Sequence, residues 1–305
     1  MSSPLVVEGL TKQFGPIRAV DDLSFTVRPG AVTGFLGPNG AGKTTTLRML
    51  LGLTRPTSGR TLVGDRPYAD HAHPGRVVGA ALEASSFHPG RTGRGHLEVF
   101  APQTGVSRAR CRAVLEAVGL AHAADQRVGG YSMGMRQRLG LATALLADPP
   151  VIVLDEPTNG LDPEGITWMR GLLRQFAAEG RTVLVSSHLL REVEASVDDV
   201  VIIAQGRLRH ASSLAQLRDR TSPATYVVAP DRAALAELAR VNGWVTRPEQ
   251  DGLVVQDVAA AEIGAAAHRA GVELHELARR DVGLEDLFLG LTRSATPGPS
   301  LGGGR

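Results

Sequence analysis

The sequence predicts an α/β fold whose core is a parallel β-sheet, followed by a smaller α+β unit. Short apolar runs at Ala31–Leu36, Val151–Leu154, Thr182–Ser186 and Asp199–Ala204 are typical of strands buried inside such a sheet. Helical patterns lie between these runs, and strands that alternate with helices favour a parallel sheet. The pattern changes near Ser222-Pro223, where a second set of elements begins.

The chain begins with two alternating segments, residues 5–9 and 23–28, which predict strands. The strand expected at Ala31–Leu36 then enters the loop Gly37-Pro38-Asn39-Gly40-Ala41-Gly42-Lys43-Thr44, which fits the phosphate-binding pattern G-x-x-x-x-G-K-[ST]. Its glycines let successive N–H groups point at an anion, which the N-terminus of a helix expected at 43–53 also faces. We expect Lys43 to reach the β- and γ-phosphates of a nucleotide and the Thr44 hydroxyl to hold Mg²⁺.

Lysine usage supports this interpretation of the loop. The chain has 33 Lys and Arg residues, and only Lys12 and Lys43 are lysines. Arginine is used wherever a positive charge alone is needed, so position 43 indicates a need for a compact ammonium on a flexible stem.

A helical stretch of about residues 84–148 follows a strand expected at 77–82. Within Tyr131-Ser132-Met133-Gly134-Met135-Arg136-Gln137-Arg138, Ser132 is a good N-cap for a helix over 133–147, which Asp148-Pro149-Pro150 ends. The residues alone leave two interpretations open. Ser132 only caps the helix, or Ser132 and the helix N-terminus bind a second phosphate.

Two carboxylates follow the strand expected at Val151–Leu154, at the sheet edge where open α/β sheets bind ligands. We expect Asp155 to hold Mg²⁺ opposite Thr44, and Glu156 to orient or deprotonate an attacking water. His188 follows the strand expected at Thr182–Ser186 and therefore lies on the same edge. Most other histidines, among them His96, stand in polar or irregular stretches, which is typical of surface positions.

The second unit is expected over residues 223–292. Its predicted elements follow the order βαββαβ, the ferredoxin-like arrangement, and a last helix over 283–291 closes it. The expected strands are 225–229, 244–248, 252–256 and 272–278, and the expected helices are 231–242 and 258–270. This unit has no catalytic group of residues and is interpreted as a dimerisation or regulatory module. Residues 293–305 are rich in Ser, Pro and Gly, which predicts a disordered tail.

The composition is typical of a globular protein, and the cysteine content is typical of a protein in a reducing compartment. Of the 305 residues, 43% are hydrophobic, and no apolar run approaches the roughly 18 residues that cross a bilayer. A single cysteine, Cys111, excludes an internal disulfide, and no secretory signal precedes the first strand. The net charge is only +2, without a basic run that carries aromatic residues, so no nucleic-acid partner is expected.

Taken in order, these motifs resemble those of the ATP-binding subunits of ABC transporters, over about residues 4–220. Gly37–Thr44 matches the Walker A motif and Val151–Glu156 the Walker B motif. Tyr131–Met135 occupies the signature position, Asn159–Asp162 matches the D-loop, and His188 matches the switch histidine. The resemblance implies a P-loop ATPase domain with a RecA-like parallel sheet, an antiparallel β subdomain and a helical subdomain at about 84–148.

The resemblance also implies how ATP and Mg²⁺ bind within one chain. Phe14 would stack on adenine, and Val20 would complete that contact. The residues expected to bind ATP are Phe14, Val20, Gly37, Pro38, Asn39, Gly40, Ala41, Gly42, Lys43, Thr44 and Thr45. The expected catalytic residues are Glu156, His188 and Lys43. The expected metal ligands are Thr44, Asp155 and Glu83, which stands where the family has its Q-loop glutamine.

Two such chains would pair head to tail, with Ser132, Gly134 and Asp162 acting on the partner's ATP. The resemblance implies a homodimer on the inner face of the bacterial cell membrane that drives a separate membrane-spanning permease. The family consensus is Leu-Ser-Gly-Gly-Gln, whereas this chain has Met133 and Met135 in its segment. Similar segments occur in exporters of the bacitracin- and daunorubicin-resistance type, so we expect export of a drug, antibiotic or lipid-like compound.

Two other classes of function fit parts of the sequence. A soluble ABC-type ATPase that acts on ribosomes or DNA usually carries two ATPase units or a long coiled-coil insertion, and this chain shows neither. A P-loop kinase or GTPase does not account for Ser132 and His188.

Overall fold

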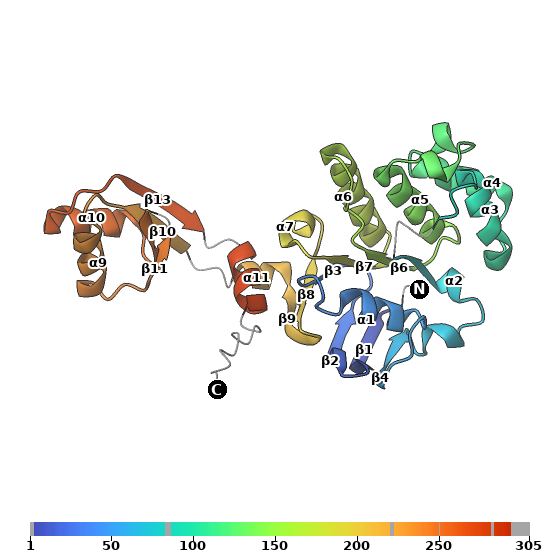
Figure 1. Cartoon of the computed structure of the whole chain (residues 1–305), viewed down its shortest axis with the longest axis horizontal. Coiled ribbons are helices and arrows are strands. Elements are labelled where there is room, and N and C mark those ends of the chain that lie inside the picture. The colour runs from blue at the N-terminus through green and yellow to red at the C-terminus, as the bar shows by residue number, and fades with distance from the viewer. Residues whose placement is uncertain (1–2, 83–86, 220–222, 250, 282–283, 294–305) are drawn as a thin grey trace, which may run out of the picture. The chain divides into compact units, whose positions relative to one another are not determined.

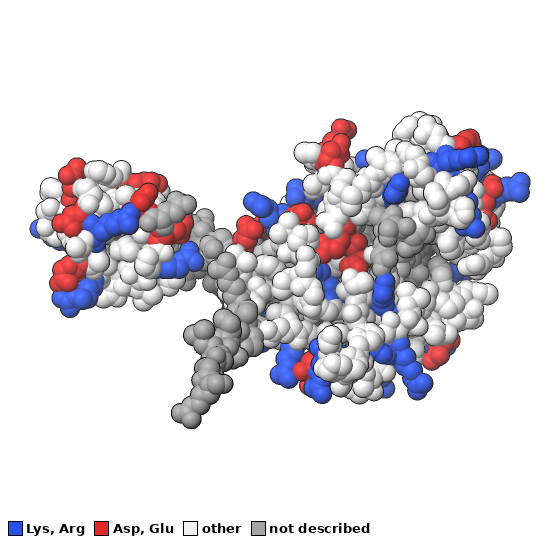
Figure 2. Space-filling view, viewed as in Figure 1, with Lys and Arg blue, Asp and Glu red and all other residues white. Residues whose placement is uncertain are grey.

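The computed structural model describes residues 3–82, 87–219, 223–249, 251–281 and 284–293. The chain forms two compact units, unit 1 (residues 1–214 with 291–305) and unit 2 (residues 215–290). Charged side chains of both signs are interspersed on the visible face of each unit (Figure 2). Within the described ranges, no helix is both long enough and apolar enough to span a membrane.

A six-stranded sheet forms the centre of unit 1, with the strand order β5-β6-β7-β3-β8-β9. All neighbouring strands are parallel except β8 and β9. The strands are β3 (Ala31–Leu36), β5 (Val78–Ala81), β6 (Val151–Asp155), β7 (Thr182–Ser187), β8 (Asp199–Ala204) and β9 (Arg207–Ser213). Every residue of β3, β6 and β7 is buried, which explains why most of their residues are apolar and do not alternate with polar ones.

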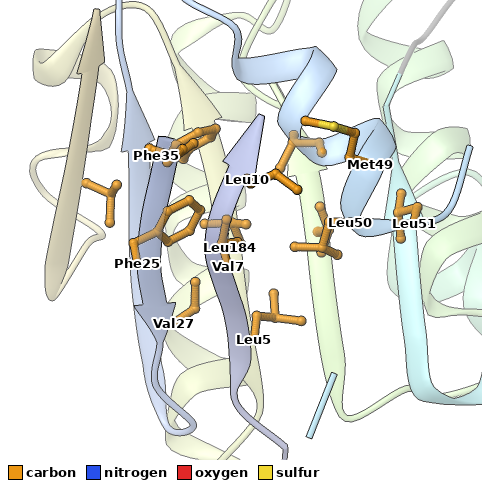
Figure 3. Packing of buried hydrophobic residues seen from close by; sticks show 14 of the residues in the cluster. Leu5, Val7, Leu10, Phe25, Val27, Phe35, Met49, Leu50, Leu51 and Leu184 are labelled. Atoms are coloured by element: carbon orange, nitrogen blue, oxygen red, sulfur yellow. The ribbon is translucent and has the colours of Figure 1, made fainter. Parts of the chain in front are cut away.

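A second, antiparallel sheet of unit 1 has the order β2-β1-β4. It consists of β1 (Leu5–Phe14), β2 (Ile17–Val27) and β4 (Ser58–Val63). The predicted first strand ended at residue 9, whereas β1 continues to Phe14 through an irregularity between Val7 and Leu10. Side chains from this sheet, from α1 (Lys43–Leu50) and from the strands β3, β5, β6, β7 and β8 form the main core, in which Phe25 stacks on Phe35 (Figure 3).

Helices cover both faces of the parallel sheet. In Figure 1, α5 (Met133–Leu145) and α6 (Pro163–Ala178) lie on one side of β3, β6 and β7, and α1 with the antiparallel sheet lies on the other. Helices α3 (Gly93–Thr104) and α4 (Arg108–Ala117) pack with α5 and form the helical part of the unit. Unit 1 also contains the short helices α2 (Pro74–Val77) and α7 (Leu190–Val193), and α8 (Leu214–Arg218) begins where the chain passes from unit 1 into unit 2.

Unit 2 contains a four-stranded antiparallel sheet of order β11-β12-β10-β13. Its elements are β10 (Pro223–Val228), α9 (Arg232–Val241), β11 (Thr246–Glu249), β12 (Gly252–Gln256), α10 (Ala260–Ala270) and β13 (Glu276–Asp281). This is the βαββαβ order of the ferredoxin-like arrangement. Its core contains Val227, Leu235, Val255 and Ile263, and α11 (Leu284–Arg293) follows along the chain.

Candidate functional site

The glycine-rich loop joins β3 to α1 and is tightly enclosed. Gly42 has φ = +103°, and a Cβ atom there would lie 2.5 Å from the carbonyl oxygen of Ala19. A Cβ atom on Gly37 would overlap the carbonyl oxygen of Ile203. Any side chain at either position would strain or displace the loop, so both glycines are required for this conformation.

The Lys43 side chain lies inside the loop and is only 6% exposed. Its Nζ donates to the carbonyl oxygen of Gly37 at 2.7 Å and to that of Pro38 at 3.3 Å. The same Nζ lies 3.4 Å from Oε1 of Glu156. The buried ammonium therefore has a carboxylate as its counter-ion, which reduces the free-energy cost of burying it.

Asp155, at the end of β6, is hydrogen-bonded by two hydroxyl groups. Thr44 Oγ1 donates to Oδ2 at 2.7 Å, and the Ser186 hydroxyl donates to Oδ1. Burial raises the pKa of the Asp155 carboxyl, although both hydrogen bonds oppose that shift. The structure thus brings together the two oxygen donors that the sequence predicts for Mg²⁺.

These donors fit a magnesium ion that also binds phosphate oxygens. Mg²⁺ in phosphate-transferring sites is usually held by one or two protein oxygens, with water and substrate phosphates completing its shell. Within the described ranges, no cluster of three or more His, Cys, Asp or Glu side chains could hold a metal by itself. Glu83, the third predicted ligand, lies outside the described residues.

Glu156 follows Asp155 and has a left-handed backbone with φ = +48°. Such a conformation in a non-glycine residue costs about 1 to 3 kcal/mol and must be held by its surroundings. The Glu156 N–H donates to Ser186 Oγ at 2.9 Å, and His188 Nδ1 lies 2.9 Å from Glu156 Oε2. Because a carboxylate only accepts, His188 Nδ1 carries the hydrogen of this bond. Lys43, Glu156 and His188 therefore form one connected chain of polar groups.

A cavity of about 370 Å³ opens at this place. It is lined by Ala19, Asn39, Gly40, Ala41, Gly42, Lys43, Thr44, Thr45 and Glu156. Most of the predicted phosphate-binding residues thus line one cavity, together with the predicted base.

The predicted adenine contact needs one correction. Val20 is fully buried in the main core and its Cγ2 packs beneath Gly42, so it offers no surface to a ligand. The preceding residue, Ala19, lines the cavity instead. Phe14 is 49% exposed, and Lys12 Nζ lies 4.8 Å from the centre of its ring while donating to the Arg55 carbonyl oxygen at 2.7 Å. Phe14 is available for stacking, although it does not line this cavity.

The residues expected to act in trans lie elsewhere in the same chain. Ser132 is the N-cap of α5, as predicted, because its Oγ accepts from the Met135 N–H at 3.2 Å. Asp162 is the N-cap of α6, where its Oδ1 accepts from the Gly165 N–H at 2.8 Å. Among the described residues that line the cavity, Ser132, Gly134 and Asp162 are absent. Their role toward a partner's ATP stays a prediction.

The expectation that His96 lies in a polar or irregular stretch is wrong. It belongs to α3 and is 5% exposed, with its ring against Phe87 and Phe100 at centroid distances of 4.8 and 5.0 Å. Its Nε2 lies 3.2 Å from Thr143 Oγ1. Burial, reinforced by the charge of Arg91, lowers the pKa of His96 to about 4. This histidine is therefore a neutral core residue.

Known proteins resemble this chain in both sequence and structure. The family model described as "ABC transporter" matches residues 20–159, and one described as a domain of unknown function matches residues 223–285. The chain is 44% identical over 223 residues to the bacitracin transport ATP-binding protein BcrA of Bacillus licheniformis, covering 72% of this chain and 73% of that protein. It is 33% identical over 295 residues to BcrA of Enterococcus faecalis, covering 94% and 96%.

A solved structure of the ATP-binding subunit of an ABC transporter superposes with a TM-score of 0.64 at 27% identity, covering 71% of this chain and 92% of that one. The Enterococcus faecalis relative matches nearly the full length of the chain, and the solved structure has the fold that the sequence predicts. The family resemblance is thus confirmed, and the chain belongs to the family of ABC transporter ATP-binding subunits, which bind and hydrolyse ATP.

Proposed function

We propose that this ATPase subunit drives export through a separate membrane-spanning permease, on the inner face of the cell membrane. The observation that supports the chemistry best is the convergence of Lys43, Glu156 and His188 with the Thr44–Asp155 hydrogen bond at one sheet edge. A loop for phosphate, oxygen donors for a metal and a carboxylate held by a histidine are the parts that hydrolysis of a triphosphate needs.

Each side chain has a distinct task in this proposal. The loop N–H groups and Lys43 bind the β- and γ-phosphates, so the Lys43 ammonium exchanges the Glu156 carboxylate for phosphate oxygens. Thr44 and Asp155 would hold Mg²⁺, whose positive charge would offset the negative charge of the phosphates. Glu156 then accepts a proton from the attacking water, and His188, bonded to Glu156 at 2.9 Å, fixes the carboxylate near the γ-phosphate.

The site is complete only when a second copy of the chain supplies the other half. The cavity is lined by Ala19, the loop and Glu156, and Ser132 and Gly134 do not contribute to its described lining. Ser132 stands at the N-terminus of α5, where backbone N–H groups and the helix dipole favour an anion. We infer that these groups bind the γ-phosphate of the ATP held by the partner, and that Asp162 joins the two sites.

The transported compound is proposed from the relatives. Two of them are named for bacitracin transport and another, from Burkholderia orbicola, is a Nod factor export ATP-binding protein, 35% identical over 297 residues. We propose a drug, antibiotic or lipid-like compound as the substrate class. The permease, rather than this chain, would contact that compound.

The Glu156→Gln variant tests this proposal. Removing the base should lower steady-state ATP hydrolysis by at least roughly 100-fold, which is typical for loss of a general base. Because ATP stays bound between two copies, size-exclusion chromatography with ATP should show a dimer, and chromatography without ATP a monomer. Arg60→Ala, which removes only an exposed ion pair with Glu8, is the matched control.

Unchanged turnover in Glu156→Gln would contradict the assignment of the base. Turnover lost without any ATP-dependent dimer would contradict the shared site. Copurification separates the alternatives for the partner: a membrane protein supports the transporter, whereas ribosomes or DNA would favour the soluble class of ABC ATPase.

A further inference from the structure

The loop between β6 and α6, residues 156–162, contains both the proposed base and the residue proposed to join the two sites. Its first residue, Glu156, has the left-handed backbone described above, and its last, Asp162, caps α6. Glu156 follows the last residue of β6, and Asp162 precedes the first residue of α6. Because the residues between them are not held by a helix or a strand, the side chains that contact the loop determine where the Glu156 carboxylate lies.

One side chain from another part of the chain holds this loop by its backbone. Gln137 stands in α5, one turn beyond the Ser132 N-cap, and is half-buried. Its Nε2 donates to the carbonyl oxygens of Glu156 and Asn159, both at 3.2 Å. The amide has two hydrogens on this nitrogen, so the two bonds use its full donor capacity.

The same helix contacts the loop and α6 at further points. A Cβ atom placed on Gly160 would lie 2.5 Å from Sδ of Met133, so the Met133 side chain packs directly on this glycine. Gly134 faces Leu161, whose Cδ2 would lie 3.4 Å from an added Cβ. The Arg138 guanidinium lies 4.1 Å from the ring centre of Trp168 in α6. The N-terminal turns of α5 and the 156–162 loop thus form one contact surface.

We infer that Gln137 is a positioning residue for the Glu156 carboxylate, and that it connects the signature segment of each chain to the base of the same chain. The inference rests on the proposed function, in which Ser132 binds the partner's ATP and Glu156 acts on the chain's own ATP. A displacement of α5 when Ser132 engages the partner's phosphate is transmitted through Gln137 Nε2 to the backbone of Glu156. The binding of ATP at one site thereby changes the position of the Glu156 carboxylate at the other site.

Substitutions that remove the donor but keep the volume test this role. Gln137→Met and Gln137→Glu should lower kcat for ATP hydrolysis between roughly 10-fold and 100-fold, the effect of displacing a reacting group by about 1 Å. The KM for ATP should stay within about twofold, because the loop and Lys43 are untouched. If Gln137 only filled space, Gln137→Glu, which has the shape of glutamine, should keep the wild-type kcat.

Three further variants make the result decisive. Gln175→Met, which removes an exposed hydrogen bond from α6 to Glu179, the residue that follows this helix, should keep wild-type turnover. Gln137→His, which restores an N–H donor, should recover turnover in part. In a Glu156→Gln background, Gln137→Met should have no additional effect on the residual rate, because both substitutions act through one carboxylate.

The outcomes separate this inference from the proposed function. Wild-type kcat in Gln137→Met with lost turnover in Glu156→Gln overturns the role of Gln137 and leaves the base assignment intact. Wild-type turnover in both variants overturns the base assignment and the role of Gln137 together. If Gln137→Met also lowers the melting temperature, the histidine variant decides: recovered turnover supports positioning, and no recovery overturns it.

Discussion

The two units differ in which polar groups they bury. In unit 1, Lys43 is 6% exposed and Asp155 is 9% exposed, and buried hydroxyl groups such as Ser186 surround them. In unit 2, the buried side chains that carry polar atoms, among the described residues, are those of Thr225 and Tyr226, and the Thr225 hydroxyl donates to the Val258 carbonyl oxygen at 2.8 Å. Unit 1 therefore buries an ammonium and a carboxyl group, whereas the described core of unit 2 buries apolar side chains and hydroxyl groups.

This difference distinguishes the unit that holds the candidate site from a unit whose described core buries neither a Lys nor an Asp side chain. Burying a charge is unfavourable unless it is paired, so buried ionisable groups are concentrated where chemistry requires them. Unit 2 keeps its ion pairs on the surface, as in Arg232–Asp251 and Arg247–Glu249. We expect substitutions in unit 1 to change nucleotide chemistry and substitutions in unit 2 to change only folding or assembly.

The largest effect is expected for Lys43→Ala. The variant loses the charged donor inside the loop and leaves the Glu156 carboxylate facing the phosphates without its counter-ion. Hydrogen bonds from a charged donor contribute about 1.5 to 3 kcal/mol each, so affinity for a fluorescent ATP analogue should fall by more than roughly 100-fold. Equilibrium binding of the analogue measures this loss of affinity, with Arg60→Ala as control. Wild-type affinity would remove the phosphate-loop interpretation and, with it, the contrast between the units.

The second largest effect is expected for the stability of unit 2. Leu235 is 1% exposed in the core with Val227, Val255 and Ile263, and Leu235→Ala should destabilise unit 2 by about 2 to 5 kcal/mol. The chain has two tryptophans, Trp168 in unit 1 and Trp244 in unit 2. Urea unfolding followed by Trp244 fluorescence in a Trp168→Phe background therefore reports unit 2.

The stability of unit 1, followed through Trp168 in a Trp244→Phe background, and the affinity of Leu235→Ala for the ATP analogue should both stay at their reference values. A loss of nucleotide binding in Leu235→Ala would show that the units do not act separately, and the contrast drawn above would be wrong.

The sequence predicts the parallel sheet well because its strands are buried on both faces. The bounds expected for Ala31–Leu36 and Asp199–Ala204 agree with β3 and β8. Strand β4 was not predicted, because Ser58 and Gly59 obscure any alternation and its strand character comes from pairing with β1. Strand β9 was also missed, since an exposed edge strand has no buried side to produce an apolar pattern.

The candidate site was predictable where its residues are adjacent in sequence. The phosphate loop and the Asp155-Glu156 pair are local motifs, and the structure brings them to one edge. Val20 was assigned from the family resemblance alone, whereas the structure buries its side chain in the main core. The contact of Gln137 with Glu156 joins residues 19 positions apart through tertiary packing, which no local pattern indicates.

The third effect concerns His96, a buried ionisable group of unit 1 that does not line the phosphate-loop cavity. Its folded pKa of about 4 is below the ordinary value of 6.5, so the unfolded chain binds the proton more tightly. Unit 1 should therefore lose stability as the pH falls from 6.5 to 4, by at most about 1.4 kcal/mol per pH unit. Above pH 6.5 this contribution is constant.

His96→Gln removes the titration but can keep a hydrogen bond to Thr143. Urea unfolding followed through Trp168 should show a shallower loss of stability below pH 6.5 in the variant than in the wild type. Equal pH dependence would mean that His96 is accessible to protons in the folded chain. Turnover at neutral pH should not change, which would sharpen the contrast by showing that burial alone does not make a group catalytic.

The smallest effect is expected at the surface of unit 2. Arg232 Nη2 lies 2.6 Å from Asp251 Oδ1, close to the distance of a strong ion pair, but the two side chains are 63% and 83% exposed. Water and salt screen such a pair, so Asp251→Ala should change the stability of unit 2 by less than about 1 kcal/mol.

The Lys43–Glu156 pair is longer, at 3.4 Å, yet its side chains are only 7% and 20% exposed, and its loss should be far more costly. Urea unfolding followed through Trp244 measures the loss of stability in Asp251→Ala, and unfolding followed through Trp168 measures it in Glu156→Gln. A larger loss in Asp251→Ala would mean that distance, rather than burial, decides what an ion pair contributes in this chain.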